Sequence, residues 1–383
     1  MGARSGRATL ADVAQAAGVS ASAVSMVMND RTGLTQATRL RILAAARAVG
    51  YPVRGRAGRE GRVLGVLPTD LGNPYHTDVI TGIEKHAESV GAAVVIGHGR
   101  RDSAHLERQL DRMLGFGVDG IVAVTTWLRP AALEDAATVL PVAVIGRMQD
   151  PATGVDMVRG DDAAGAAQAV RHLVRLGHTR LVHVTMSTRP GPAARRAGFL
   201  AEAARLGLEG QARVIGPAAD WAAMEEQIDA FLERIRAGRS TAPTAVFAAN
   251  DIAAVRVMHR AAALGVRVPQ QLSVVGYDSS AAALMIRPHL TSVNQPREEM
   301  GRLAAGMVLE RLAGRASDAE LIVRPVLRER ESSTWHPDAD RETANQTGDA
   351  ANPTGDAANP TGDAADPPGT GPNRSADPAA ASG

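Results

Sequence analysis

TLADVAQAAGVSASAVSMVMNDRTGLTQATRLRILAAARAVGY, residues 9–51, is patterned as three short helices. Thr9 and Asp12 have the spacing of a capping box, and apolar residues at helical intervals follow them. Gly18 predicts the end of this first helix, and Ser20 can cap a second one. Because only the tight turn 17–19 separates them, the two helices are predicted to form a helix-turn-helix.

A third helix is predicted over residues 35–49. Thr35 is its expected N-cap, and Gly50 is its expected C-terminal stop. The side of this helix that faces the other two is expected to consist of Leu40, Ile42, Leu43 and Ala46. The sequence therefore predicts an all-α head.

The charge of the 383-residue chain is close to neutral in total but unevenly distributed. Residues 1–62 hold ten arginines against three acidic residues, a net charge of +7, whereas residues 337–383 carry a net charge of −6. Clustered arginines raise both affinity and encounter rate for a phosphate backbone, so an anionic partner is expected for the head. A solvated basic surface is the alternative.

Composition excludes several classes of site. The chain has no cysteine, which rules out disulfides, thiolate metal ligands and thiol nucleophiles. No apolar run approaches the roughly 20 residues of a membrane helix, and the first residues lack the apolar stretch of a secretory signal. We expect a cytoplasmic protein without membrane contact, cofactor or metal site.

A repeat of seven residues marks the C-terminal end: TGDAANP occurs twice from residue 347 and is followed by TGDAADP. These repeats hold no bulky apolar side chain that could offset the entropy of ordering the backbone. Residues 336–383 are therefore predicted to be a disordered tail. Competition of its acidic residues with DNA for the basic head is the functional alternative.

The head resembles the DNA-binding domain of the LacI/GalR repressor family, in register and without a gap over residues 9–51. The motifs that carry the resemblance are AGVS (17–20), VSMVMN (24–29), TRLRI (38–42) and the closing GY (50–51). It implies that residues 1–52 form a helix-turn-helix DNA-binding domain, whose second helix enters the major groove of double-stranded operator DNA.

The resemblance also implies which residues contact DNA. Family positions that read bases are occupied by Ala21, Ser22 and Met26. Positions that contact phosphate are occupied by Thr9, Ser20, Ser25, Asn29, Thr38 and Tyr51. Many members have an arginine where this chain has Met26, and methionine offers only apolar contact, for instance to a thymine methyl. Weaker direct readout is expected there, unless Met26 packs inward.

The linker departs from the family pattern. Members normally continue into a short hinge helix with a leucine that inserts into the minor groove, but residues 53–62 read VRGRAGREGR. Their three glycines disfavour a helix, and no leucine is present. Arg54 and Arg56 are instead predicted to track phosphates or to lie in a narrow minor groove as part of a flexible arm.

After the linker the pattern changes to short buried strands that alternate with helices. The predicted strands are VLGVLP from residue 63, AVVIGHG from 93, GIVAV from 120, VAVIG from 142, LVHVT from 181, AVFAA from 245 and SVVGYD from 273. Such runs indicate parallel sheets covered on both faces. Residues 63–335 are too many for one compact sheet, so two Rossmann-like lobes with a ligand cleft between them are predicted.

This body resembles the sensor domain of the same family, which is similar to periplasmic sugar-binding proteins. The motifs include DLGNPYHTDVITGIE (70–84), RRAGF (195–199), AANDIAA (248–254) and LTSVNQP (290–296). By that resemblance the effector-binding residues are Thr69, Asn73, Tyr75, Arg147, Arg195, Trp221, Asn250, Asp278 and Gln295. Amide and carboxylate groups that fork onto adjacent hydroxyls suit a sugar or related polyol or nucleoside.

Several of these assignments have alternatives. Arg195 could form a structural ion pair instead of contacting ligand, and Trp221 could belong to the core. His76 stands where the family often has phenylalanine, and Gly146 stands where an aspartate is common. These two departures leave the identity of the effector open.

Other functions have little support in the sequence. An enzyme on Rossmann-like lobes would need a recognisable motif, and the chain has no P-loop, GxSxG or HExxH. A transport-type binding protein would need a secretory signal in place of the head. The prediction is a homodimeric transcriptional repressor that responds to a small molecule; the alternative is a sugar-binding protein without DNA-reading specificity.

Overall fold

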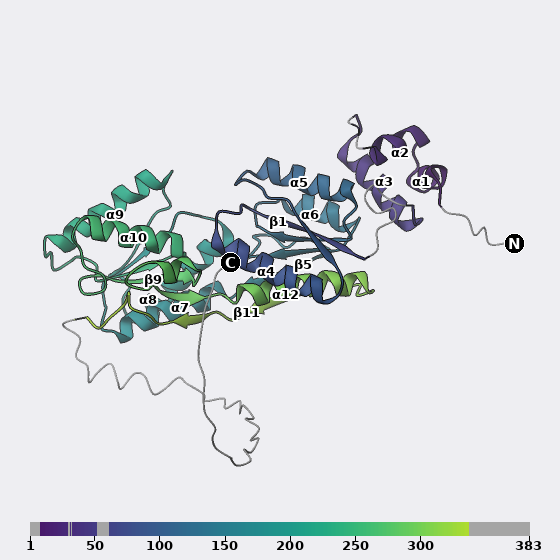
Figure 1. Ribbon diagram of the computed structural model, residues 1–383. Coiled ribbons are helices and arrows are strands. Elements are labelled where there is room, and N and C mark those ends of the chain that lie inside the picture. The colour runs from purple at the N-terminus through teal and green to yellow at the C-terminus, as the bar shows by residue number, and fades with distance from the viewer. Residues whose placement is uncertain (1–7, 30, 32, 52–60, 337–383) are drawn as a thin grey trace, which may run out of the picture.

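The computed structural model describes residues 8–29, 31, 33–51 and 61–336. A small helical head lies at one end of two α/β lobes that follow each other along the length of the molecule (Figure 1). The predicted linker residues Arg54 and Arg56 and the tail 337–383 lie outside the described part of the chain. Within that part, no single helix is long and apolar enough to span a membrane.

The head consists of α1 (Leu10–Ala17), α2 (Ala21–Met28) and α3 (Gln36–Ala48). The capping box of α1 is formed: the Asp12 amide donates to Thr9 Oγ1 (3.3 Å) and the Thr9 amide donates to Asp12 Oδ2 (2.7 Å). Gly18 ends α1 with a φ of 62°, which favours glycine, and α2 follows at a bend of 109°. This is the predicted helix-turn-helix.

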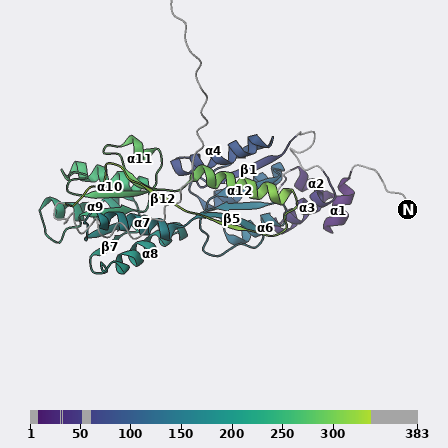
Figure 2. The ribbon, with the colours of Figure 1, turned by 90° about the horizontal axis from the view of Figure 1, so that it is seen from below.

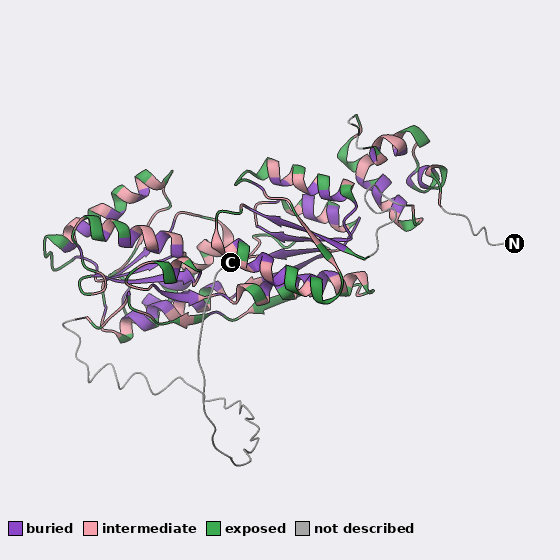
Figure 3. Ribbon diagram, in the orientation of Figure 1, coloured by how far each residue is buried: buried purple, intermediate pink, exposed green. Residues whose placement is uncertain are grey.

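The N-terminal lobe is a six-stranded parallel sheet with the order β11-β5-β4-β3-β1-β2. Its strands are β1 (Val63–Pro68), β2 (Ala93–Ile96), β3 (Gly120–Val124), β4 (Val142–Ile145), β5 (Val155–Gly160) and β11 (Glu320–Val323). One face is covered by α4 (Pro74–Ser89) and α12 (Arg297–Leu312), and the other by α5 (Ser103–Phe116) and α6 (Pro130–Ala137). The central strands are buried on both faces, as Figure 3 shows.

The C-terminal lobe repeats this plan with the order β12-β10-β9-β8-β6-β7, in which only β12 runs antiparallel. Its strands are β6 (Leu181–Val184), β7 (Ala212–Ile215), β8 (Ala245–Ala248), β9 (Ser273–Asp278), β10 (Thr291–Asn294) and β12 (Val326–Arg328). Its helices are α7 (Asp162–Arg175), α8 (Pro190–Arg205), α9 (Trp221–Arg236), α10 (Asp251–Ala263) and α11 (Ala282–Met285). The predicted two-lobed fold is confirmed.

The chain crosses between the lobes after β5, β10 and β11, so neither lobe is a continuous segment. The crossing helix α12 lies against α4, as Figure 2 shows. Their approach depends on glycine: a Cβ at Gly82 would lie 1.9 Å from the carbonyl oxygen of Glu298, and one at Gly301 would lie 2.1 Å from that of Val79. These contacts hold the crossing segment against the N-terminal lobe.

The head contacts the N-terminal lobe at the end opposite to the cleft. The Arg47 guanidinium on α3 donates to the carbonyl oxygens of Val118 (2.6 Å) and Val139 (3.3 Å), which precede β3 and β4. The carboxyl ends of those two strands lead to Thr125 and Arg147 in the cavity described below. Head contact and cavity therefore lie at opposite ends of the same two strands.

Candidate ligand cleft and candidate nucleic-acid interface

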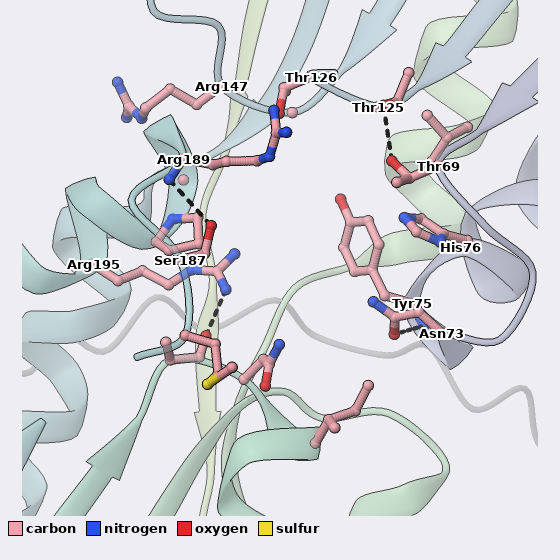
Figure 4. Close-up of a pocket in the computed structure, with 18 of the residues that line it drawn as sticks. Thr69, Asn73, Tyr75, His76, Thr125, Thr126, Arg147, Ser187, Arg189 and Arg195 are labelled. Atoms are coloured by element: carbon pink, nitrogen blue, oxygen red, sulfur yellow. Dashed lines mark hydrogen bonds between the residues drawn. The ribbon is translucent and has the colours of Figure 1, made fainter. Parts of the chain in front are cut away.

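The carboxyl ends of the strands in both sheets border a cavity of about 310 Å³ between the lobes (Figure 4). Open parallel sheets bind ligands at this edge because the loops that follow the strands meet there. Of the predicted effector-binding residues, the ones that line this cavity are Thr69, Asn73, Tyr75, Arg147, Arg195, Trp221, Asn250 and Gln295. Asp278 is the exception.

The wall from the N-terminal lobe is built on the loop after β1 and the start of α4. Thr69 donates its hydroxyl to Thr125 Oγ1 (2.8 Å), and Asn73 caps α4 by accepting from the Tyr75 amide (3.1 Å). The Tyr75 hydroxyl projects into the cavity. Burial, followed by the negative charge of Asp278, raises the pKa of Tyr75 well above its ordinary value, so the phenol stays protonated and can donate.

His76 lies beside this wall, where Nδ1 is 2.7 Å from the carbonyl oxygen of Asp70. Burial lowers the pKa of His76 and outweighs the opposing effect of Asp70, so the ring is neutral at physiological pH. A neutral imidazole whose Nδ1 donates to a carbonyl offers Nε2 as an acceptor. The position where the family often has phenylalanine thus gains a polar group at the cavity.

The wall from the C-terminal lobe is organised by Arg195 on α8. Its Nε donates to Asp162 Oδ1 (2.9 Å), and its Nη1 donates to the carbonyl oxygen of Ala249 (2.7 Å). The guanidinium also lies 3.8 Å from the centre of the Tyr277 ring. Burial alone would lower the pKa of Arg195, but Asp162 and Tyr277 raise it, so the charge is held. Arg195 thus forms the ion pair and lines the cavity, and its contact with a ligand stays a prediction.

Asp278 is buried directly behind Gln295 and is not among the residues that line the cavity, so its contact with an effector stays a prediction. Gln295 lines the cavity and covers this carboxylate, donating from Nε2 to Asp278 Oδ1 (2.8 Å). Burial raises the pKa of Asp278 to about 7, against the opposing effect of Arg195. The Gln295 amide thus lines the cavity with its orientation fixed by Asp278.

The raised pKa of Asp278 predicts a pH dependence of stability. Between about pH 4 and 7 the Asp278 carboxyl group holds a proton in the folded protein but has lost it in the unfolded chain. As pH rises through that window, Asp278 therefore lowers the free energy of unfolding, by at most about 1.4 kcal/mol per pH unit. In Asp278→Asn this contribution disappears, while an acceptor for Gln295 is retained. Urea unfolding at pH 5 and 7.5 should show the variant gaining stability over the wild type at the higher pH; a parallel profile would contradict the assignment.

Several cavity residues were not predicted from the sequence. They are Arg101, Thr125, Trp127, Asp162 and Arg189, and most follow a strand at its carboxyl end. TTW (125–127) comes directly after the predicted strand GIVAV. Because loops that follow parallel strands meet at the ligand edge, the sequence could have indicated these residues. Asp162 follows β5, which had not been predicted, and therefore had no such signal.

The head presents the predicted DNA-reading residues on an exposed N-terminal turn of α2. Ala21 and Ser22 are exposed, whereas Val24 and Val27 on the same helix are buried against α1 and α3. Ser20 caps α2 by accepting from the Ala23 amide (3.2 Å). A helix that offers its first turn to solvent and its apolar face to the domain has the arrangement needed to enter a groove.

The remaining predicted DNA contacts are spread around this turn. Thr9 caps α1, Thr38 lies in the first turn of α3, and Tyr51 is half-buried against the head's core. The Asn29 side chain donates to the Ser25 carbonyl oxygen (2.9 Å) and so continues the end of α2. Their contacts with DNA stay predictions.

Met26 is half-buried, between the exposed and the buried sides of α2. A Cβ at Gly33 would lie 3.1 Å from Met26 Cε, so the methyl group rests against the loop before α3.

Metal binding was not expected. Within the described residues, no group of three or more histidine, cysteine or acidic side chains could hold a metal ion. His178, in the same segment as His172, forms hydrogen bonds through both ring nitrogens: Nε2 lies 2.9 Å from Ser273 Oγ, and Nδ1 lies 3.1 Å from Thr244 Oγ1. These histidines are part of the packing.

Comparison with known proteins matches both parts of the chain. Residues 9–52 match the bacterial regulatory proteins of the lacI family, and residues 170–333 match the periplasmic binding protein-like domain. The chain is 30% identical to the HTH-type transcriptional repressor PurR of Pectobacterium atrosepticum, over 85% of this chain and 96% of that protein.

Two solved structures have similar folds. The transcriptional regulator CelR in complex with cellobiose is 27% identical, with a TM-score of 0.59 over 85% of this chain and all of that one. The lac repressor dimer bound to operator and the anti-inducer ONPF is 25% identical, with a TM-score of 0.62 over 86% of this chain and all of that one.

Proposed function

Because the chain belongs to the LacI family of bacterial regulatory proteins, we propose that it is a transcriptional repressor whose operator affinity is set by a small molecule in the cleft between its lobes. The observation that carries this proposal is the combination of two sites in one chain. A helix-turn-helix with an exposed first turn of α2 is joined to lobes that enclose a polar cavity. Such a protein acts in the cytoplasm, where the DNA is.

The proposed effector is a sugar or related polyol. Asn73, Asn250 and Gln295 supply amide groups at the cavity, and the Tyr75 phenol supplies a donor. Amides and hydroxyls pair with adjacent hydroxyls of a polyol, and aromatic faces cover its apolar side. CelR, with a similar fold, was solved with cellobiose.

We further propose that the protein acts as a homodimer on a near-palindromic operator. A single α2 reads only one half-site, and two-fold symmetry places two heads along one face of the duplex. The lac repressor structure is that of a dimer on its operator.

Regulation follows from linkage. An effector that binds one arrangement of the lobes better shifts DNA affinity by the same free energy as DNA shifts effector affinity, typically about 1 to 3 kcal/mol. Either sign is consistent with the fold: the effector releases the operator, or it strengthens binding as a corepressor.

The test is a fluorescence-anisotropy titration of the full chain against DNA from upstream of its own gene and against scrambled DNA, at several salt concentrations. Selective binding with a slope of log affinity against log salt of about −0.9 per neutralised phosphate is expected. Equal, weak binding to both DNAs calls for selection from a randomised library. If that selection also enriches no sequence, the chain is a small-molecule-binding protein without DNA-reading specificity, and the proposal is wrong.

Trp221 gives a test of the cleft. It starts α9, lines the cavity and has the Arg256 guanidinium 4.2 Å from its ring centre. If the face of the ring away from Arg256 covers the effector, Trp221→Ala should weaken effector binding by more than about 1 kcal/mol. Trp221→Phe keeps an aromatic ring and should lose less binding free energy. The affinity is measured by calorimetry with a compound that shifts operator binding. Equal affinity in the alanine variant would assign Trp221 to the core.

A further inference from the structure

The charges that line the cleft do not balance. Four guanidinium groups border the cavity, those of Arg101, Arg147, Arg189 and Arg195, against the carboxylates of Asp70 and Asp162. His76 adds no charge because burial lowers its pKa. The cavity wall therefore carries an excess of two positive charges, and low-dielectric walls concentrate such a field in the space between them.

The ion pairs show where this excess lies. Arg101 pairs with Asp70 (3.5 Å), and Arg195 pairs with Asp162 (2.9 Å) and, more distantly, with Asp278 behind the wall (4.0 Å). Arg147 reaches the same Asp162 carboxylate from 3.5 Å, so it shares a charge that Arg195 already neutralises. Arg189 forms no ion pair with any described carboxylate.

Arg189 is held in place by an aromatic ring instead of an acid. Its guanidinium lies 3.7 Å from the centre of the Trp127 ring, which belongs to the opposite lobe. Figure 4 shows its side chain extending across the cavity toward Thr126. Burial lowers the pKa of Arg189, and no acidic neighbour compensates for it. Stacking on an aromatic face orients a guanidinium and leaves its N–H donors available at the edge.

We propose that the effector is an acidic polyol, carrying a phosphate or carboxylate group that binds Arg189, with Arg147 as the second cation of the same cavity. This inference rests on the proposed function and names the class of its effector. A phosphate monoester carries a charge of about −1.5 to −2 at neutral pH, which matches the excess on the wall. A neutral sugar in the closed cleft would desolvate the Arg189 guanidinium without supplying a counter-ion, which costs free energy.

The experiment compares matched ligands on the full-length protein. Ribose is paired with ribose 5-phosphate, and glucose with glucose 6-phosphate and glucuronate, by calorimetry and thermal melting at constant ionic strength. We expect at least one acidic compound to bind 10-fold or more tightly than its neutral counterpart. The phosphate and the carboxylate series show which acid is preferred.

Two variants locate the effect. Arg189→Gln should weaken the binding of the acidic ligand by about 10- to 100-fold, as expected for loss of charge-assisted hydrogen bonds. The affinity for the neutral ligand should change little. Arg196→Gln is the matched control, because it removes the same charge from an exposed position on α8 that does not line the cavity. It should bind as the wild type does.

The inference would be overturned by neutral members that bind as tightly as acidic ones, by no binding of any acidic member, or by an acidic preference unchanged in Arg189→Gln. Stabilisation by inorganic phosphate equal to that by the sugar phosphates would also overturn it, because the polyol would then contribute nothing. The operator titration and library selection, run without ligand and again with the ligands above, decide the proposed function separately, so failure of one is distinguishable from failure of the other.

Discussion

Arg195→Met is expected to lower the free energy of unfolding by about 3 to 5 kcal/mol. The substitution removes the hydrogen bonds to Asp162 Oδ1 and to the Ala249 carbonyl oxygen. Asp162 is only 5% exposed and would keep a single cationic neighbour, the Arg147 Nε at 3.5 Å. A buried carboxylate that loses its main partner accounts for an effect of this size. Urea denaturation of the full chain measures it.

A double-mutant cycle separates the ion pair from simple loss of packing. In Arg195→Met/Asp162→Asn the Asp162 charge is gone, so the double variant should be clearly more stable than the sum of the single losses implies. Additive losses, or a loss below about 1 kcal/mol for Arg195→Met alone, would contradict the central role of the pair. Binding to operator DNA should be retained, since the head lies at the opposite end of the N-terminal lobe.

The strands that could be predicted from the sequence are mostly the central ones. β3 and β9 were predicted with their observed bounds, because β3 is a continuous apolar run and β9 has an apolar centre, and both are fully buried. β5 was missed because it contains Asp156 and Arg159; the Asp156 side chain is fully buried and paired with Arg315 (2.7 Å), more than 150 residues away in the chain. Local patterning carries no information about such a partner.

Three of the four edge strands were missed for a different reason. β7, β11 and β12 are short and partly exposed, so they lack the buried run that marks a strand. β11 and β12 also join different sheets, although only residues 324 and 325 separate them. The predicted two-lobed architecture was correct, but the repeated crossing of the chain could not be derived from local sequence.

The same distinction applies to the site. Residues that directly follow a recognisable strand, such as Thr69 and Asn250, could be assigned to the cleft in advance. Whether a side chain lines the cavity or supports one that does depends on tertiary packing, and the position of Asp278 behind Gln295 could not be read from the sequence. The contact between Arg189 and Trp127 joins two lobes, so no local pattern indicates it.

Met26→Arg should change which operator the protein selects. α2 directs Val24 and Val27 into the head and leaves Ala21 and Ser22 exposed, with Met26 half-buried between the two sides. An arginine there has the length to reach a base edge, and a bidentate pair with guanine is worth about 1 to 3 kcal/mol of discrimination. Selection from a randomised library should therefore enrich guanine at one base pair of each half-site, by about 5- to 150-fold over the wild type.

Two controls show whether the new side chain reads a base. Met26→Leu keeps an apolar group and should not enrich guanine. If the arginine instead contacts a phosphate, Met26→Arg should bind all sequences more tightly, and its slope of log affinity against log salt should steepen by about one unit. An arginine that faces the groove must change either the selected sequence or the salt slope. If neither changes, the side chain at position 26 does not reach DNA, and residue 26 serves to pack against the loop at Gly33.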